Sequence, residues 1–384
     1  FGEVRAPGLA RWDGERWSAL PGLDGPGLEL DRRAITLEVF DDGSGPVLFV
    51  GGEFTTAAGL PVGGIIRWDG ASWNALAGSD APARGSTVYD VHPHDAGDGT
   101  KIYVSGVLLD DAGQSMGSVR RWDGMAWSTP GPNPPGASTV FSLESFGHDL
   151  FAAGRFESLG AEPAPGLARF DGHAWSAPMG SDQQLVGFEF WPLERGVLEG
   201  RPVLLTSGFF RVEEAGRTIA QNVATWDGAR WNSLGVIDSR TIRNGRAMAT
   251  MDDGDGEAIF VGGFQVAGVY GAVRLRDGQV RPLQGMIDGP VYALLAYDDG
   301  AGPMLLAGGE FENVQGVASY LAGWRPSAPC ILDFSEDCVV NVLDYLAFQD
   351  RFMAGDPRAD FDGDGELTIF DFLAIQNAFD AGCP

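Results

Sequence analysis

The residues best suited to chemistry are oxygen-bearing side chains near the end of the sequence. They recur at positions 1, 3, 5, 9 and 12 of a twelve-residue loop, and a backbone carbonyl is available at position 7: Asp360, Asp362, Asp364, Thr368, Asp371 and, through its carbonyl, Glu366. Gly365 stands at position 6, where such a loop turns sharply. Hard oxygen donors at this spacing select calcium over metals that prefer softer ligands. The segment is therefore predicted to bind a calcium ion.

A second copy of this loop lies 27 residues upstream, which indicates a tandem duplication. Its oxygen donors occupy the same loop positions: Asp333, Ser335, Asp337, Val339 through its carbonyl, Asn341 and Asp344. Cys338 replaces the glycine at position 6, so the backbone there must tolerate or avoid a left-handed conformation. A second calcium ion is expected at this loop, which is the less regular of the two.

Both loops end in aspartate where a usual EF-hand has glutamate, and a single predicted helix follows each. In these features residues 330–384 resemble a type I dockerin, and the closing Ala-Gly-Cys-Pro is similar to the terminal modules of secreted planctomycete-type proteins. The resemblance implies a small all-α, EF-hand-like module that folds with calcium and docks to a cohesin-like receptor or cell-surface anchor. It also implies partner contacts from the residues at loop positions 10 and 11: Val342, Leu343, Ile369 and Phe370.

These four apolar residues have a second interpretation, in which they pack inside the module. The sequence offers other candidates for that core, at position 8 of each loop and along both helices: Val340, Leu367, Leu346, Phe348, Leu373 and Ile375. If those residues supply the core, the residues at positions 10 and 11 face outward and form an apolar patch of the kind that marks an interaction site. Sequence alone leaves both interpretations open.

The three cysteines all fall in the last 55 residues. A bridge between Cys330 and Cys383 would join the two ends of the helical module, and a bridge between Cys330 and Cys338 is the alternative; the sequence does not decide between them. Either bridge implies an oxidising compartment, which agrees with calcium loops that need millimolar ion. The expected location is extracellular or on the cell surface.

A repeat of about 50 residues organises the chain up to about residue 325. One half of the unit reads RWDGERW at 11–17 and recurs four times in close form, with weaker copies at 275–278 and 323–324. The other half is an apolar run that ends in small residues and an aromatic, such as LFVGGEF at 48–54. An alternating strand, a turn, an apolar strand and a DG hairpin account for four strands in each unit. Consecutive copies are 48–56 residues apart, which fits a four-stranded propeller blade.

At these residues the sequence resembles kelch-type β-propellers and the GGxF…RWDGxxW repeats of bacterial surface proteins. The resulting expectation is a mainly β chain in which residues 1–325 form the propeller, 326–329 a linker and 330–384 the helical module. Seven copies of the DG half and six of the other half are present, and Phe1 stands where a GGxF strand would end. We therefore expect a seven-bladed propeller of four-stranded blades whose first blade is truncated.

The propeller repeats carry little that predicts catalysis. His92-Pro-His94 followed by Asp95 has the composition of a metal site, but alternation along a strand that runs into a turn explains the pattern better. Acid-rich turns such as 252–255 could each hold a weakly bound calcium ion, but Asp-Gly is also ordinary hairpin chemistry. No histidine has a serine or cysteine partner at a recognisable spacing. No catalytic residue is assigned, although 53 acidic residues leave carboxylate chemistry in the channel open.

Charge and composition narrow the range of partners. The 384 residues include 26 basic and 53 acidic side chains, and the net charge of −27 repels nucleic acid and anionic membranes. The sequence has no run of about 18 apolar residues, so membrane insertion is not expected. These features favour a secreted, non-catalytic binding or scaffold propeller for a glycan or protein ligand, tethered through the calcium-dependent module. Two alternatives stay open: a carbohydrate-active enzyme with its site in the channel, and a structural surface-layer component.

Overall fold

The computed structural model describes most of the chain. The described residues are 8–13, 16–20, 29–41, 45–131, 138–180, 182–234, 242–254, 256–266, 269–283, 289–298, 300, 302–311, 313–314, 317–318, 320–325, 334, 342–361 and 365–381. The chain divides into two compact units. One consists of residues 1–250, 258–295 and 307–322, and the other of residues 251–257, 296–306 and 323–384.

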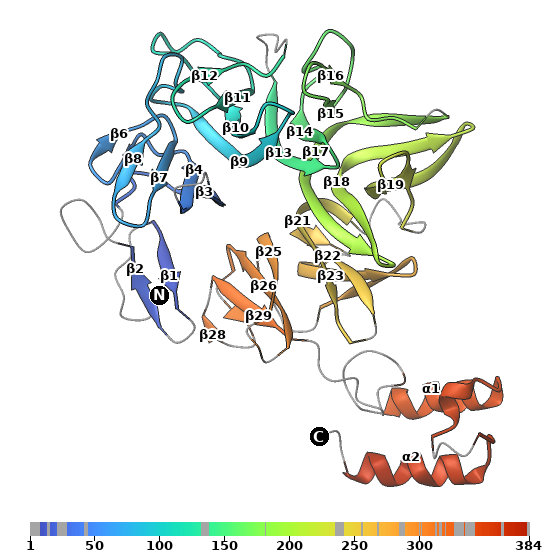
Figure 1. Ribbon diagram of the computed structural model, residues 1–384. Helices are drawn as coiled ribbons and strands as arrows, with labels where there is room; N and C mark the ends of the chain where they lie inside the picture. Colours follow the sequence, from blue (N-terminus) through green and yellow to red (C-terminus); the bar gives the residue numbers. More distant parts are fainter. Residues whose placement is uncertain are drawn as a thin grey trace. The chain divides into compact units, whose positions relative to one another are not determined.

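Strands dominate the fold, and most belong to sheets built on one plan. Five sheets have four strands arranged in chain order. They are β3 (Ala34–Asp41), β4 (Pro46–Gly52), β7 (Ile65–Trp68) and β8 (Trp73–Ala75); β9 (Thr87–Asp95), β10 (Thr100–Val107), β11 (Val119–Trp122) and β12 (Trp127–Ser128); β13 (Thr139–Phe146), β14 (Asp149–Arg155), β15 (Leu167–Phe170) and β16 (Trp175–Ser176); β17 (Gln183–Leu198), β18 (Arg201–Glu214), β19 (Arg217–Trp226) and β20 (Trp231–Asn232); β21 (Ile242–Asp252), β22 (Glu257–Val266), β23 (Val269–Arg276) and β24 (Gln279–Pro282). The sheets form a propeller-like ring with the first strand of each innermost (Figure 1), so the prediction of a mainly β propeller is confirmed.

The remaining strands depart from this plan. A sixth blade has three strands in the described part of the chain: β25 (Val291–Asp298), β26 (Pro303–Gly309) and β29 (Leu321–Trp324). Near the start of the chain, β1 (Ala10–Trp12) and β2 (Trp17–Ala19) form a two-stranded sheet by themselves. Small hairpins join β5 (Thr56–Ala57) to β6 (Leu60–Pro61) and β27 (Asn313–Val314) to β28 (Val317–Ala318). The expectation of four strands in each blade is thus met in five sheets.

Each DG hairpin is held together by its aspartate. Asp69 Oδ1 accepts hydrogen bonds from the backbone amides of Ala71 and Ser72, at 2.9 and 2.7 Å. The same pair of bonds recurs at three later copies of the motif, on Asp123, Asp171 and Asp227. Gly70 has φ +95°, a conformation that glycine adopts without steric cost. Turn geometry therefore explains why the Asp-Gly sequence recurs in these hairpins.

The tryptophans that flank the turn connect neighbouring blades. Trp68 and Trp73 face each other across the hairpin, with 5.1 Å between their ring centroids. In three copies the second tryptophan donates its Nε1 hydrogen to a carbonyl just after the preceding sheet: Trp127 to Leu76 at 3.3 Å, Trp175 to Pro130 at 2.8 Å and Trp231 to Pro178 at 2.9 Å. These rings fill the wedge where the radial sheets diverge, and each satisfies its one polar atom there.

The second unit contains α1 (Val342–Met353), the 3-10 turn η1 (Pro357–Ala359) and α2 (Ile369–Ala381). Their shared core contains Phe334, Phe348, Ala359 and Ile375, all buried. In the part of the chain that the structure describes, no helix has both the length and the apolar character needed to cross a membrane.

Candidate functional site

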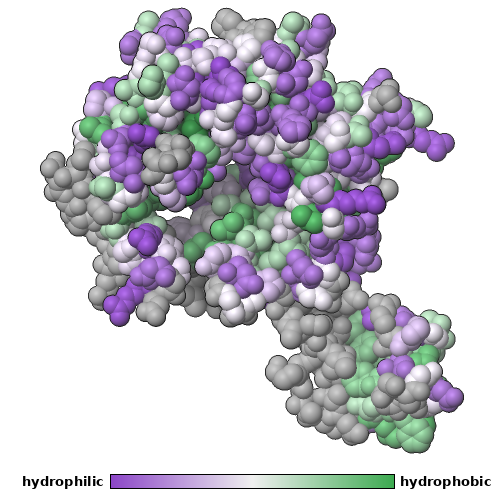
Figure 2. All heavy atoms as spheres, viewed as in Figure 1, coloured by the Kyte–Doolittle hydropathy of each residue, from purple (hydrophilic) through white to green (hydrophobic). Residues whose placement is uncertain are grey.

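The ring encloses a central cavity of about 980 Å³. All six inner strands, β3, β9, β13, β17, β21 and β25, contribute to its wall. Figure 2 shows a hollow at the centre of the ring, with apolar side chains along part of its wall. A concave site with an apolar lining and a few convergent polar groups is the usual form of a ligand pocket.

Bulges in the inner strands determine which side chains line one level of this cavity. The pairing of the inner strand with the second strand skips Ile35 in β3, Tyr89 in β9, Phe141 in β13, and Trp191 with Pro192 in β17. Bulges of this kind redirect side chains and are common beside active sites. Strands β21 and β25 add Arg246 and Tyr292 to the same wall. We call Ile35, Tyr89, Phe141, Trp191, Arg246 and Tyr292 the collar.

Three aromatic rings of the collar contact one another along the cavity wall. Tyr89 meets Phe141 edge to face with 5.6 Å between centroids, and Phe141 stacks on Trp191 at 4.9 Å with 7° between the ring planes. The guanidinium carbon of Arg246 lies 3.1 Å from the centroid of the Trp191 ring. Phe264 of β22 also lines the cavity and meets Tyr292 edge to face at 5.6 Å. The collar is therefore an aromatic wall with a cationic side chain held within it.

A layer of ionisable side chains lies three residues further along the inner strands, roughly 10 Å from the collar. Its members share one register position, opposite Phe49, Tyr103, Phe151 and Leu205 of the second strands: Glu38, His92, Glu144 and Glu194. Between the two levels, Asp90 accepts hydrogen bonds from the Thr36 hydroxyl at 3.3 Å and the Leu143 amide at 2.7 Å. We call these four residues and Asp90 the acidic layer.

Burial keeps the carboxyls of the acidic layer protonated to unusually high pH. It raises the pKa of Glu144 to about 8, with the nearby Glu194 carboxyl as the second cause. Burial and then the Asp90 carboxyl raise the pKa of Glu194 and that of Glu38 to about 7 each. The pKa of Asp90 rises to about 6, because burial outweighs the hydrogen bonds that the carboxylate accepts. The layer therefore exchanges protons near neutral pH, where most protein carboxyls are fully ionised.

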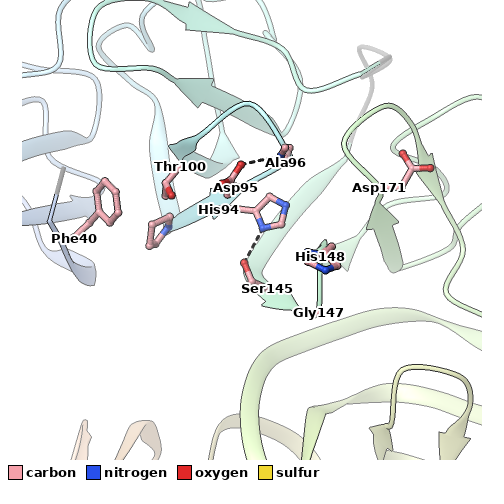
Figure 3. A pocket seen from close by; sticks show the side chains of 11 residues that line it. Phe40, His94, Asp95, Ala96, Thr100, Ser145, Gly147, His148 and Asp171 are labelled. Atoms are coloured by element: carbon pink, nitrogen blue, oxygen red, sulfur yellow. Dashed lines mark hydrogen bonds between the residues drawn. The ribbon is translucent and has the colours of Figure 1, made fainter. Parts of the chain in front are cut away.

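A second cavity, of about 540 Å³, opens at the turn end of β9 and β13 (Figure 3). On its wall Ser145 Oγ lies 2.9 Å from both His92 Nε2 and His94 Nδ1. The Ser145 backbone amide is shared between Glu144 Oε1 at 2.9 Å and His92 Nε2 at 3.1 Å. A hydroxyl has one hydrogen, so Ser145 donates to one of the two rings and accepts from the other. Burial lowers the pKa of His92 to about 4 and also lowers that of His94, which keeps both rings neutral.

The two histidines lie on strand β9 just before the turn at Asp95, as alternation predicted. Their serine partner, Ser145, bonds to both rings from the next sheet and stands 53 residues from His92 in sequence, so no spacing pattern indicated it. Within the described residues, no three His, Cys, Asp or Glu side chains are grouped so that they could hold a metal ion.

The predicted calcium loop at 360–371 is described at both ends. Gly365 has φ +87°, the left-handed conformation expected of a glycine at loop position 6. Asp371, fully buried, accepts hydrogen bonds from the Phe361 and Thr368 amides at 2.7 Å each, and Asp360 accepts one from the Gly365 amide at 2.8 Å. The described part of this loop is therefore compatible with the predicted calcium ligands.

Several predicted residues lie outside the described part of the chain. They are the linker 326–329, Asp333, Ser335, Asp337, Val339, Asn341, Asp362, Asp364 and the cysteines Cys330, Cys338 and Cys383. Asp344, the counterpart of Asp371 in the first loop, is described and is also fully buried.

The division of the helical module's apolar residues into buried and exposed side chains differs from the expectation. Phe348 and Ile375 are buried, but Leu346 and Leu373, which were expected in the core, are each 49% exposed. The two leucines are 27 residues apart, so the duplication places them at the same position of each helix. Ile369 and Phe370 at the start of α2 are 66% and 61% exposed. Val342 and Leu343 begin α1, and their side chains lie outside the described set.

The collar and the acidic layer were missed by sequence reasoning. A signal for the acidic layer was present, because Glu38, Glu144 and Glu194 stand in the alternating strand that precedes the turn of three different repeats. The collar had a weaker signal, an aromatic at the start of several inner strands. Its selection depends on bulges, which the hydrophobic pattern does not reveal.

Comparisons with known proteins give little beyond the fold. No protein-family model matches the chain, and no curated protein matches it in sequence. Similar solved structures include an ancestral GH74 enzyme (13% identity, 82% of this chain and 44% of that chain, TM-score 0.43) and the computationally designed Ika8 protein (12% identity, 76% and 70%, TM-score 0.37). A third is a triple arginine mutant of AofleA from Arthrobotrys oligospora (12% identity, 79% and 92%, TM-score 0.38).

Proposed function

We propose that this protein is a secreted, non-catalytic glycan-binding propeller that takes its ligand at the collar. The observation that carries the proposal is the collar itself: bulges in successive inner strands bring Tyr89, Phe141 and Trp191 into the wall of the 980 Å³ central cavity, and β25 adds Tyr292. Flat aromatic surfaces with few polar groups suit the apolar faces of sugar rings.

The charges in the cavity narrow the class of glycan. Glu38 and Glu194 line the cavity three residues further along the inner strands than the collar. Among the described residues, their carboxyls have neither a hydrogen bond nor an ion pair. Arg33 is paired with Glu53 at 2.8 Å and Arg246 is held on Trp191, so neither balances these carboxyls directly. An anionic polysaccharide would be repelled by the net charge of −27, and by these carboxyls once the pH rises above about 7 and they ionise. We propose a neutral or amine-bearing glycan.

A second candidate function is hydrolysis of the bound glycan. It is favoured by the acidic layer, because glycosidases need one carboxyl that stays protonated near neutral pH and a second that acts as base or nucleophile. Glu144, with its pKa raised to about 8, has the first property, and Glu194 is its strongest carboxyl neighbour. The non-catalytic proposal is preferred because binding requires only the collar.

The helical module is proposed to tether the propeller outside the cell. Its support is the pair of loop sequences with calcium-ligand spacing, together with the left-handed Gly365. We propose that it folds with calcium and docks to a cohesin-like receptor through Val342, Leu343, Ile369 and Phe370. The exposed Leu346 and Leu373 extend that apolar surface, one on each helix.

We further propose that the ring has seven blade positions. The pair β1–β2 carries the same RWDGxxW hairpin as the third and fourth strands of the complete sheets, with Trp12 opposite Trp17 as Trp68 is opposite Trp73. The hairpin therefore represents the outer half of a seventh blade.

Titration calorimetry with three oligosaccharides of similar length tests the glycan proposal. Cellohexaose and a glucosamine hexamer are expected to bind, and an oligogalacturonate is not. Tyr292→Ala should weaken binding by roughly tenfold or more, whereas Tyr320→Ala, which removes an exposed tyrosine outside the cavity, should not. Equal binding of all three oligosaccharides, or equal effects of the two substitutions, would refute the proposal. Turnover of the bound glycan that is lost in Glu144→Gln would establish hydrolysis instead.

A further inference from the structure

The inner strand β3 exposes an apolar face that its counterparts bury. Leu37 is opposite Val50 in the pairing of β3 with β4, and the same register position is held by Val91, Leu143 and Leu193 in the next three sheets. Leu37 is 51% exposed, and the other three are 1%, 2% and 4% exposed. Val39, on the same face, is 61% exposed. Nothing in the described part of the chain covers this face.

The exposed face of β3 borders a gap in the ring. On the other side of this gap lies β26, and among the described residues that side is open at Gly308. The glycines Gly51, Gly262 and Gly308 hold the same place in three copies of the apolar repeat strand. A Cβ atom on Gly51 would lie 2.7 Å from Val88 Cγ1, and one on Gly262 would lie 2.6 Å from Val291 Cγ1, each on the following sheet. In the described part of the chain, a Cβ on Gly308 would meet only Ala293 of its own sheet, at 3.8 Å. Among the described residues, no sheet closes on β26 as β9 closes on β4.

The strand β1 has a free edge between these two faces. In the complete sheets the third strand pairs on both sides, as β7 does with β4 and β8, whereas β1 pairs only with β2 in the described residues. The hairpin is nevertheless anchored, because Leu9 and Leu20 pack on the core that contains Val50 and Ile66. Compared with a complete sheet, this hairpin lacks an inner strand and a second strand in the described part of the chain.

We propose that this gap is a docking site for a β-hairpin of the repeat's own type: an alternating strand, an Asp/Gly turn and an apolar strand ending in Gly-Gly. The inference rests on the seventh blade position proposed above and not on glycan binding. Such a hairpin covers Leu37 and Val39 with its second strand, as β4 covers Val88 and Val91 through the close approach at Gly51. The pairing of β4 with β7 sets the register, so a residue equivalent to Leu48 lies opposite Trp12 and one equivalent to Phe49 opposite Arg11.

The test uses the full chain and a synthetic peptide with the sequence of residues 34–54, which span β3 and β4. The peptide should bind with one-to-one stoichiometry and raise the melting temperature. Leu37→Asp should weaken binding by roughly tenfold or more. Leu346→Asp changes an equally exposed leucine on α1 and should leave binding unchanged. Absence of peptide binding, or equal effects of the two substitutions, overturns the proposal.

Hydrogen exchange at the β1 amides separates failure of the docking proposal from failure of the seventh position. Slow exchange that appears only with the peptide supports both. Amides already protected without the peptide mean that β1 has no free edge, and the seventh position is then wrong as well. Fast exchange that the peptide does not slow would refute the docking proposal and leave the seventh blade position standing. A dimer that Leu37→Asp dissociates would show that a second copy of the chain occupies the gap, which also overturns the hairpin partner.

Discussion

Arg246 is held over the indole ring of Trp191, with its guanidinium carbon 3.1 Å from the ring centroid. Arg246 Nε and Trp191 Nε1 are both buried and have no hydrogen-bond partner among the described residues. Burial lowers the pKa of Arg246, which is the direction expected when a cation loses its hydration. The contact with the ring and the charge of the nearby Glu189 carboxyl therefore compensate for the desolvation of this side chain.

The first prediction concerns the coupling energy between Arg246 and Trp191. A double-mutant cycle with Arg246→Met and Trp191→Leu should give a coupling energy of about 1–2 kcal/mol in chemical denaturation, because the cation is desolvated against the ring. Arg201→Met, at an exposed arginine of β18, is the control and should be additive with Trp191→Leu. Additivity in both cycles would contradict a stabilising contact.

The second prediction concerns pH. The folded state raises the pKa of Glu144 from 4.5 to about 8, so its contribution to stability is present below about pH 4.5 and is lost as pH rises through 8. The free energy of unfolding should therefore fall between pH 5 and pH 9. Glu144→Gln should reduce this fall by on the order of 2 kcal/mol. Denaturation curves at both pH values measure the change, with Glu162→Gln at an exposed position as the control. An equal fall in all three proteins would show that Glu144 is not responsible.

The third prediction compares two glycines at the same place in the repeat. Gly51→Ala should destabilise the protein by roughly 1–3 kcal/mol, because the added Cβ would lie 2.6 Å from Thr36 Cγ2 and 2.7 Å from Val88 Cγ1. Gly308→Ala should change stability by less than about 0.5 kcal/mol, because its Cβ would make only an ordinary contact at 3.8 Å. Equal losses would mean that Gly308 also lies against a neighbouring sheet.

The fourth prediction concerns calcium. Carboxylates of an empty loop repel each other, so chelation with EDTA should remove much of the helical circular dichroism while the strand signal and its thermal transition persist. Asp360→Ala should reproduce most of the chelator effect, and Asp333→Ala less of it. Asp350→Ala, at an exposed position of α1, is the control. Calorimetry that shows both transitions unmoved by EDTA would disprove the calcium assignment.

The fifth prediction concerns the docking surface. The 27-residue duplication places equivalent apolar pairs at the start of α1 and α2, so either pair can contact the same receptor. Changing Val342 and Leu343 to serine, or Ile369 and Phe370 to serine, should leave capture by a cohesin-like domain nearly intact, and changing all four should abolish it. Met353→Ser, at a side chain that is 76% exposed, should have no effect. Loss of capture from one pair alone would refute the two-sided mode.

The sequence by itself determined the repeat architecture. The RWDGxxW hairpins and apolar GG strands predicted the sheets, because turn chemistry and strand alternation are local and are repeated in each unit. The same locality explains why Asp69, Asp123, Asp171 and Asp227 were recognised as turn residues. Loop spacing likewise predicted the calcium ligands, since all of them lie within twelve residues of chain.

Only the tertiary structure decided which side chains share the central cavity. Tyr89, Phe141 and Trp191 meet because a bulge in each strand redirects one residue, and a bulge depends on how two strands pair. Ser145 bonds to His92 and His94 because β13 closes on β9 in the ring, a contact that 53 residues of intervening chain conceal. The raised pKa of Glu144 has the same origin, because it depends on burial by strands from several repeats. The exposure of Leu37 was also decided by the tertiary structure. Apolar residues at the same register position of the next three sheets are buried, and Leu37 is exposed because no sheet covers it in the described chain.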